Sequence, residues 1–105
     1  ESASQYMRWV ALADNVIVGF CEHTLACEIS RLYVHKDHLR KGVGSKLVKS
    51  AEDSLKQSGC LHIHIESTIT AKEFYEANGY EVIERAIYDG DESAPVYLMA
   101  KVIPG

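Results

Sequence analysis

The sequence predicts one mixed α/β domain of the α+β kind, with elements in the order β-β-β-α-β-α-β-β. Three observations support this class. Two β-prone apolar runs flank a short polar turn, a helical spacing of apolar residues begins at Gly44, and a second, shorter helical pattern lies between later strands. The 105 residues suffice for one hydrophobic core, and no repeat or linker-like segment interrupts them. We therefore expect a single domain over residues 1–105.

The first three strands are predicted from apolar runs and turn residues. Residues 10–13 and 16–20 are apolar and flank Asp14 and Asn15, a pair that favours a tight turn, so they should form a hairpin. Residues 29–34 form the third strand. Its end, residues 32–34, is continuously apolar, which is typical of a strand that is buried on both faces.

A long helix should follow the third strand. From Gly44 onward, four apolar residues share one helical face: Leu47, Val48, Ala51 and Leu55. Gly59 is well placed to end this helix, because glycine readily adopts the left-handed conformation that follows a helix C-terminus.

The second half should contain three strands and one short helix. A strand over residues 61–65 comes first, and the sequence Thr70-Ala71-Lys72-Glu73 fits a capping box that begins a helix. This helix should end near Gly79. Two closing strands, residues 80–87 and 96–102, flank the polar loop YDGDESAP.

Composition and charge exclude several classes of function. A net charge of −4 argues against a general nucleic-acid surface, and no apolar run approaches the ~20 residues of a membrane-spanning helix. No signal-peptide core is present in the first residues. Three cysteines, an odd number without CxxC spacing, predict reduced thiols and hence a cytoplasmic protein.

The loop between the third strand and the long helix is the first candidate binding site. Gly42 and Gly44 let backbone N–H groups approach a phosphate, and the helix N-terminus adds unsatisfied donors and partial positive charge. Arg40 and Lys41 add full charges. The spacing fits neither a Walker loop nor a dinucleotide fingerprint, whose third glycine would fall on Leu47. From the residues alone, a phosphate cradle and a simple strand-to-helix turn remain equally good explanations.

Two linked blocks carry a family resemblance over about residues 10–102. EISRLYVHKDHLRKGVGSKL, followed at the expected distance by ESTITAKEFYEANGYEVI, resembles the GCN5-related N-acetyltransferases (GNAT). The resemblance implies a mixed sheet and acetyl-coenzyme A as cosubstrate, without a metal. It also implies that the usual N-terminal strand and two helices of the family are missing, which would leave a compact or truncated member.

The resemblance assigns cofactor-binding residues in three places. The main chain of residues 32–34 should pair with the pantetheine arm, and residues 40–45 should cradle the pyrophosphate. Thr68 stands where the family often has Asn, and Leu39 stands where it has Arg or Gln. The full set is Leu32, Tyr33, Val34, Arg40, Lys41, Gly42, Val43, Gly44, Ser45 and Thr68.

The resemblance also implies a reaction in which a primary amine attacks the thioester directly. Tyr75 matches the family tyrosine that protonates the departing thiolate, and Glu28 is the candidate general base, with Glu22 and Glu66 as alternatives. An alkyl amine is only about 10⁻³ neutral at pH 7, a penalty of roughly 4 kcal/mol that a base can offset. The pairs His35/His38 and His62/His64 lack further ligands at suitable spacing, so no metal site is expected.

The acceptor, a small-molecule or peptide amine, cannot be named from the sequence. Because the chain starts at Glu1 with few residues before the hairpin, it could be a fragment completed by a partner chain. A non-catalytic module that binds coenzyme A or has a regulatory role is the alternative function. Within LHIHIE, residues 61–66, polar side chains alternate with apolar ones, and this exposed-looking face predicts a homo-oligomer. No nucleic-acid or membrane partner is expected.

Overall fold

The computed structural model describes residues 6–39, 41–87 and 95–103. They fall into two compact units, Glu1–Cys60 and Leu61–Gly105, and each unit is described by itself. The predicted order of strands and helices is confirmed. The prediction of a single domain over residues 1–105 is not tested by this division.

The first unit begins with the predicted hairpin. β1 (Tyr6–Ala13) pairs antiparallel with β2 (Val16–Thr24), so both strands are longer than predicted. Asp14 (φ 53°) and Asn15 (φ 66°) form the turn with two left-handed residues, as a tight hairpin requires. The register shifts by one between Ala11 and Leu12 because β2 carries a bulge.

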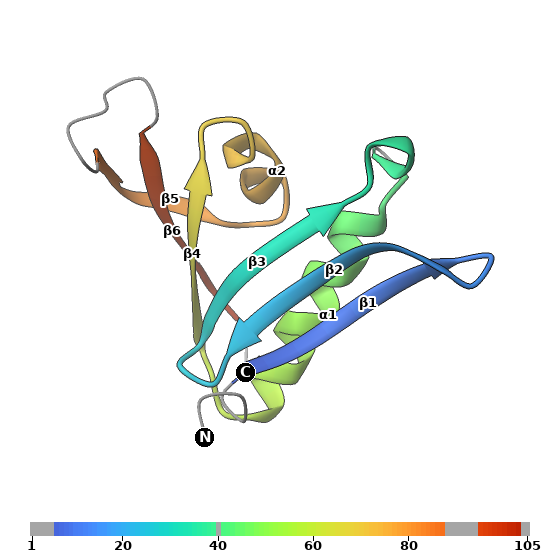
Figure 1. The fold of residues 1–105 in the computed structure, drawn as a ribbon. Helices are drawn as coiled ribbons and strands as arrows, with labels where there is room; N and C mark the ends of the chain where they lie inside the picture. The colour runs from blue at the N-terminus through green and yellow to red at the C-terminus, as the bar shows by residue number, and fades with distance from the viewer. Residues whose placement is uncertain (1–5, 40, 88–94, 104–105) are drawn as a thin grey trace. The chain divides into compact units, whose positions relative to one another are not determined.

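β3 (Glu28–Val34) pairs antiparallel with β2, and helix α1 (Val43–Gln57) covers one face of β1, β2 and β3 (Figure 1). The prediction that residues 32–34 are buried on both faces is wrong, because Tyr33 lies on the uncovered face and is 49% exposed. Strand residues alternate between faces, so a continuous apolar run does not by itself show that both faces are covered.

The core of the first unit lies between α1 and these strands. The four predicted helix residues are all buried: Leu47, Val48, Ala51 and Leu55. Complete burial of a Leu or Val side chain stabilises a fold by about 1.5–3 kcal/mol. Gly19 permits this close packing, since a Cβ there would lie 2.8 Å from Tyr33 O and 3.2 Å from Leu47 Cδ1.

Helix α1 ends as the sequence predicts. Gly59 adopts φ 95°, its N–H donates to Lys56 O (3.0 Å), and Cys60 N–H donates to Leu55 O (3.0 Å). Cys60 is joined by a disulfide to Cys27, a left-handed turn residue (φ 63°) between β2 and β3. The prediction of reduced thiols is therefore wrong for this pair, and only Cys21 is free.

The second unit contains β4 (His62–Thr68), α2 (Lys72–Ala77), β5 (Glu81–Ala86) and β6 (Val96–Val102). β6 lies between β4 and β5 and is antiparallel to both. Along β4, Ile63 and Ile65 are buried, whereas His62, His64 and Glu66 are exposed, so the predicted polar face is confirmed. The loop over residues 88–94 lies outside the described residues.

The predicted capping box at Thr70 is wrong. Helix α2 begins after Ala71, which makes no side-chain cap, and the Ala71 N–H donates instead to Thr68 Oγ1 (3.2 Å). The hydroxyl at the end of β4 thus accepts from Ala71 N–H, whereas a capping box at Thr70 would accept from Glu73 N–H. Neither described helix is long and apolar enough to cross a membrane.

Candidate functional site

The connection from β3 to α1 forms an anion-binding geometry. Gly42 is the N-cap of α1 with φ 81°, and no side chain caps the helix. The first helical bond runs from Lys46 N–H to Gly42 O (3.1 Å), so the N–H groups of Val43, Gly44 and Ser45 have no acceptor inside the helix. Open space surrounds Gly42, since a Cβ there would meet nothing within 4 Å. These donors and the helix dipole favour a bound phosphate.

Charged side chains lie beside these donors. Lys41, two residues before α1, and Lys46, the fourth residue of α1, are both exposed. Arg40, the other predicted cation, lies outside the described residues. Leu39, which replaces the family's Arg or Gln, is 55% exposed and brings no charge.

The preceding loop is fixed to the sheet by main-chain bonds. His35 N–H donates to Val18 O (2.7 Å), and His35 Nδ1 accepts from Asp37 N–H (3.1 Å) at the start of the short 3-10 helix η2 (Lys36–His38). The rings of His35 and His38 lie edge to face, with 6.1 Å between their centroids. Within residues 6–39, 41–87 and 95–103, no three His, Cys, Asp or Glu side chains come together as a metal site would require.

The predicted pantetheine strand has two different faces. Leu32 and Val34 are half-buried toward α1, while Tyr33 points to the open face and packs against Phe20 (5.7 Å between ring centroids). The main chain of residues 32–34 pairs with β2 along one edge. Residues 32–34 and residues 41–45 of the predicted cradle both belong to the first unit.

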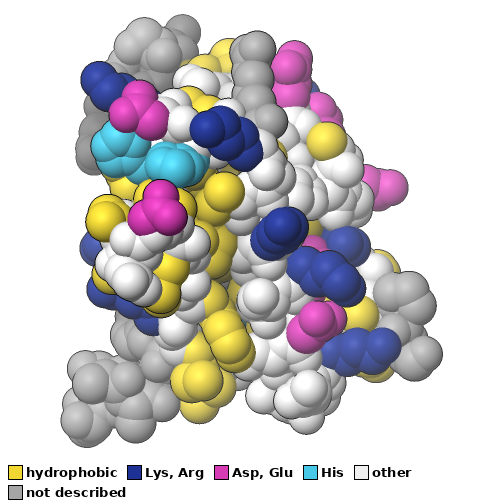
Figure 2. Space-filling model, turned by 90° about the vertical axis from the view of Figure 1, so that its right-hand side faces the viewer, with side chains coloured by type: hydrophobic (Ala, Val, Ile, Leu, Met, Phe, Trp, Pro, Cys, Tyr) yellow, Lys and Arg dark blue, Asp and Glu magenta, His cyan; other side chains and the backbone are white. Residues whose placement is uncertain are grey.

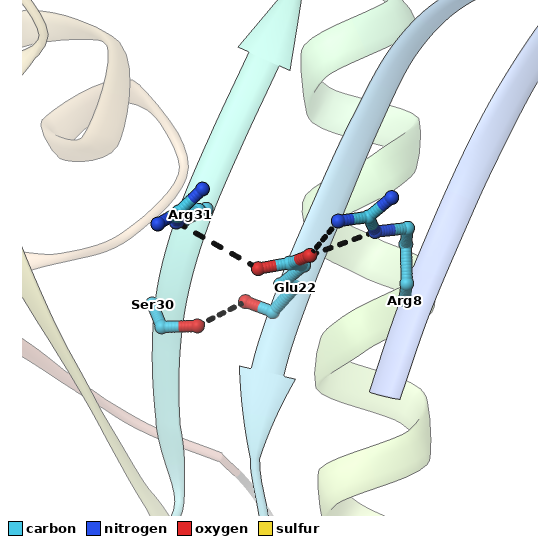
Figure 3. Close-up of polar contacts among 4 residues, drawn as sticks. All are labelled: Arg8, Glu22, Ser30 and Arg31. Atoms are coloured by element: carbon cyan, nitrogen blue, oxygen red, sulfur yellow. Dashed lines mark hydrogen bonds and ion pairs between the residues drawn. The ribbon is translucent and has the colours of Figure 1, made fainter. Parts of the chain in front are cut away.

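Glu22, an alternative general base, is held in an ion-pair network that the sequence analysis missed (Figure 3). Arg8 donates through Nε to Glu22 Oε2 (2.7 Å) and also through its Nη2, and Arg31 Nε lies 3.8 Å from Oε1. Ser30 Oγ donates to the main-chain oxygen of Glu22 (3.2 Å). Arg8 and Arg31 occupy the carboxylate oxygens that would have to accept a proton from the substrate, which disfavours Glu22 as a base. Glu28, at the start of β3, is half-buried.

The remaining predicted site residues belong to the second unit. Tyr75 lies in α2, is 6% exposed, and packs edge to face on Phe74 (5.2 Å) and Tyr80 (5.9 Å). Thr68 ends β4, and its hydroxyl accepts from the N–H of Ala71, the residue before α2. Tyr80, the residue before β5 (Glu81–Ala86), is 2% exposed.

The free thiol of Cys21 is unsuited to nucleophilic chemistry. Burial, together with the charges of Glu22 and Glu52, raises its pKa from 9.0 to about 12. Only a thiolate is an effective nucleophile, so a neutral Cys21 is inert at physiological pH.

Comparison with known proteins places the chain in a family. Residues 1–91 match the model of the acetyltransferase (GNAT) domain. The chain is a GNAT acetyltransferase family member. Spermidine N(1)-acetyltransferase of Thermoplasma acidophilum is 30% identical over 79 residues, which are 69% of this chain and 48% of that protein.

Solved structures share the fold. A GCN5-related N-acetyltransferase from Rhodopseudomonas palustris is 26% identical with a TM-score of 0.87, over 95% of this chain and 63% of that one. The PaiA N-acetyltransferase from Thermoplasma acidophilum, in complex with coenzyme A, is 27% identical with a TM-score of 0.78, over 97% and 65%. The chain spans about half the length of the curated relatives it matches.

Proposed function

We propose that this chain transfers the acetyl group of acetyl-coenzyme A to a primary amine. The observation that carries the proposal is the uncapped start of α1 after left-handed Gly42, in a chain of the GNAT family. Two similar proteins support the proposal. One is named Spermidine N(1)-acetyltransferase, and the structure of the other, the PaiA N-acetyltransferase, is in complex with coenzyme A.

The residues of the first unit fit the polar part of this cosubstrate. The free N–H groups of Val43, Gly44 and Ser45 would bind the pyrophosphate, with Lys41 and Arg40 supplying positive charge. The main chain of residues 32–34 would pair with the pantetheine arm. Thr68, in the second unit, would add a hydroxyl contact, although this hydroxyl already accepts from Ala71 N–H.

The reaction would proceed by direct attack. The lone pair of the neutral amine forms the new C–N bond at the thioester carbonyl, and the C–S bond breaks to release a thiolate. Tyr75 would give its phenolic proton to that sulfur, and Glu28 would take the proton that the amine loses. Because Glu22 is bound by Arg8 and Arg31, Glu28 is the better candidate base.

The test is release of coenzyme A thiol from acetyl-coenzyme A when an amine is added. A panel of polyamines, aminoglycosides, amino acids and peptides should contain at least one member that raises release about tenfold or more above the amine-free rate. Mass spectrometry of that amine should show one added acetyl group. Saturable binding of acetyl-coenzyme A without turnover on any amine would contradict the proposal.

That outcome would instead support a non-catalytic module that binds coenzyme A. The observation that favours this second candidate is Leu39, which stands where the family has Arg or Gln and brings no charge. Such a module would bind the cofactor and be indifferent to Tyr75→Phe.

A cytoplasmic location also remains a proposal. An acetyl-coenzyme A substrate supports it, and the Cys27–Cys60 disulfide opposes it because disulfides are rare in that compartment. Thiol labelling of the protein in freshly lysed, acid-quenched cells shows whether Cys27 and Cys60 are reduced or joined. Labelled Cys27 and Cys60 would support the cytoplasm.

A further inference from the structure

Lys101 occupies an unusual place for a lysine side chain. Figure 2 shows Lys and Arg side chains at the surface of one face of the molecule, where charged groups usually lie. Lys101, on β6, is instead half-buried, and it shares a face of the sheet with buried Ile63, its partner on β4. Its ammonium donates to the main-chain oxygen of Asn78 (2.9 Å), 23 residues earlier in the chain. A lysine of β6 thus binds the residue that follows α2.

The turn that ends α2 is built on the main-chain oxygen of Tyr75. The N–H groups of Asn78 and Tyr80 both donate to this oxygen, at 3.0 Å each. Gly79 lies between them with φ 95°, the left-handed conformation in which many helices end. A shift of this turn therefore moves the last turn of the helix that carries the Tyr75 side chain.

Lys101 contacts every residue of this turn. Besides its bond to Asn78 O, its ammonium lies over the ring of Tyr80, 5.6 Å from the centroid. Its stem fills the space beside Gly79, where a Cβ would lie 3.2 Å from Lys101 Cε. A positive charge is also favourable at the C-terminal end of a helix, because the last carbonyl groups are partly negative. One side chain therefore holds the whole turn.

Helix α2 depends on contacts of this kind. It has only six residues and no side-chain cap at its start, whereas isolated helices shorter than ~12–15 residues are marginal in water. The Tyr80 ring that Lys101 covers also packs edge to face on Tyr75, with 5.9 Å between the ring centroids. Lys101 therefore acts on Tyr75 by two routes, through the main chain of the turn and through the ring of Tyr80.

We propose that Lys101 is a positioning residue for the phenol of Tyr75. The inference rests on the proposed acetyl transfer, in which Tyr75 gives its proton to the departing thiolate. That step requires the hydroxyl to stay within hydrogen-bond reach of the sulfur. Without the ammonium the turn loosens, and the phenol spends less time in the reactive geometry. In this role Lys101 acts only through Tyr75 and touches no reacting atom.

A double-mutant cycle tests whether Lys101 acts through Tyr75. Lys101→Met keeps most of the stem and removes the ammonium, so kcat should fall about tenfold, while the Kd for acetyl-coenzyme A should change by less than about twofold. In a Tyr75→Phe background the same change should lower kcat by less than about twofold, because no proton donor remains to be positioned.

Two further variants are the controls. Lys101→Arg should keep kcat within about threefold of the native value, since a guanidinium can also donate to Asn78 O. Lys56→Met makes the same chemical change at an exposed position of α1 and should leave kcat unchanged.

Hydrogen exchange followed by NMR tests the anchoring of the turn without turnover. The amides of Asn78 and Tyr80 should exchange about tenfold faster in Lys101→Met than in the native chain or Lys101→Arg. Amides of α1 should exchange at unchanged rates, which separates local loosening from a general loss of stability.

Unchanged exchange at Tyr80 overturns the proposal, as does a tenfold fall in kcat that persists in the Tyr75→Phe background. A native chain without activity would contradict acetyl transfer alone, because the exchange rates do not depend on turnover.

Discussion

Cys21 shows how burial controls the chemistry of a single side chain. It has no exposed surface on β2, and Glu22 and Glu52 oppose its ionisation, so its pKa lies near 12 against 9.0 for an ordinary thiol. Between these two values the unfolded chain loses this proton and the folded chain keeps it. Folding stability should therefore be unaffected by Cys21 below pH 9 and should fall as the pH rises from 9 toward 12.

This linkage is measurable by urea unfolding at pH 8 and pH 10.5. Between pH 8 and pH 10.5, the native chain should lose about 2 kcal/mol of unfolding free energy through Cys21. This figure follows from a slope of ~1.4 kcal/mol per pH unit above the pKa of the unfolded thiol. Cys21→Ala should lose less by that amount, because other groups titrate alike in both proteins. Equal losses in the two proteins would show that Cys21 ionises normally in the folded state.

Tyr75 is the residue on which the proposed chemistry depends most. Tyr75→Phe removes the proton donor and keeps the ring that packs on Phe74 and Tyr80, so kcat should fall about 100-fold. The Kd for acetyl-coenzyme A should change by less than about twofold, since no part of the binding proposal uses this hydroxyl. Tyr80→Phe is the matched control and should leave kcat within about threefold. An unchanged kcat in Tyr75→Phe would remove Tyr75 from the mechanism.

The ion pair of Glu22 was not predictable from the sequence. A two-residue turn at Asp14 and Asn15 places Ala13 opposite Val16, and this register continued would set Arg8 opposite Cys21. The bulge moves the register by one residue, so that Arg8 lies opposite Glu22 instead. One extra residue in β2 therefore decides that the carboxylate of Glu22 is bound by Arg8.

At the scale of elements, the start of α1 depends on the left-handed conformation of Gly42. Gly42→Ala should lower the unfolding free energy by about 1 kcal/mol, because an L-residue at φ 81° is strained even in open space. Gly42→Asn should lower it less, since Asn tolerates this conformation better. Urea unfolding of the three proteins gives the comparison. If the Gly42→Ala protein were as stable as the native protein, the residue before α1 would adopt another conformation in solution.

The disulfide ties the end of α1 to the turn between β2 and β3. Cys27 and Cys60 are 33 residues apart, and closing a loop of that length should stabilise the fold by roughly 3–4 kcal/mol on the chain-entropy estimate. Unfolding in urea with and without a phosphine reductant measures the effect. Cys21→Ala should respond to the reductant as the native chain does. A stability that does not change with reductant would mean that the two thiols are not joined in solution.

Local signals predicted the elements better than the contacts between them. Periodicity located α1 and its four buried residues, and turn residues located the hairpin, because both depend on neighbours in sequence. The Cys27–Cys60 pair depends on how the chain folds back over 33 residues, which cysteine counting does not reveal. The start of α2 at Ala71 instead of Thr70 likewise goes with a contact outside the four-residue pattern, in which Thr68 Oγ1 accepts from Ala71 N–H.

For the whole molecule, the sequence resemblance predicted the family and the fold, whereas the phosphate cradle stays a prediction. Gly42 and the free N–H groups at residues 43–45 agree with the predicted phosphate site. The roles of Tyr75, Glu28 and Thr68 remain predictions from the resemblance. The acceptor amine could not be predicted, because no described residue group in this chain distinguishes one amine from another.

The most direct test of the central claim is calorimetric titration of the 105-residue chain with acetyl-coenzyme A. The account predicts saturable binding with one site per chain, and loss of that binding in Gly44→Trp, whose indole would occupy the first turn of α1. Gln57→Trp, exposed at the other end of the same helix, is the control and should bind like the native chain. No binding in the native chain, or equal binding in Gly44→Trp, would contradict the account.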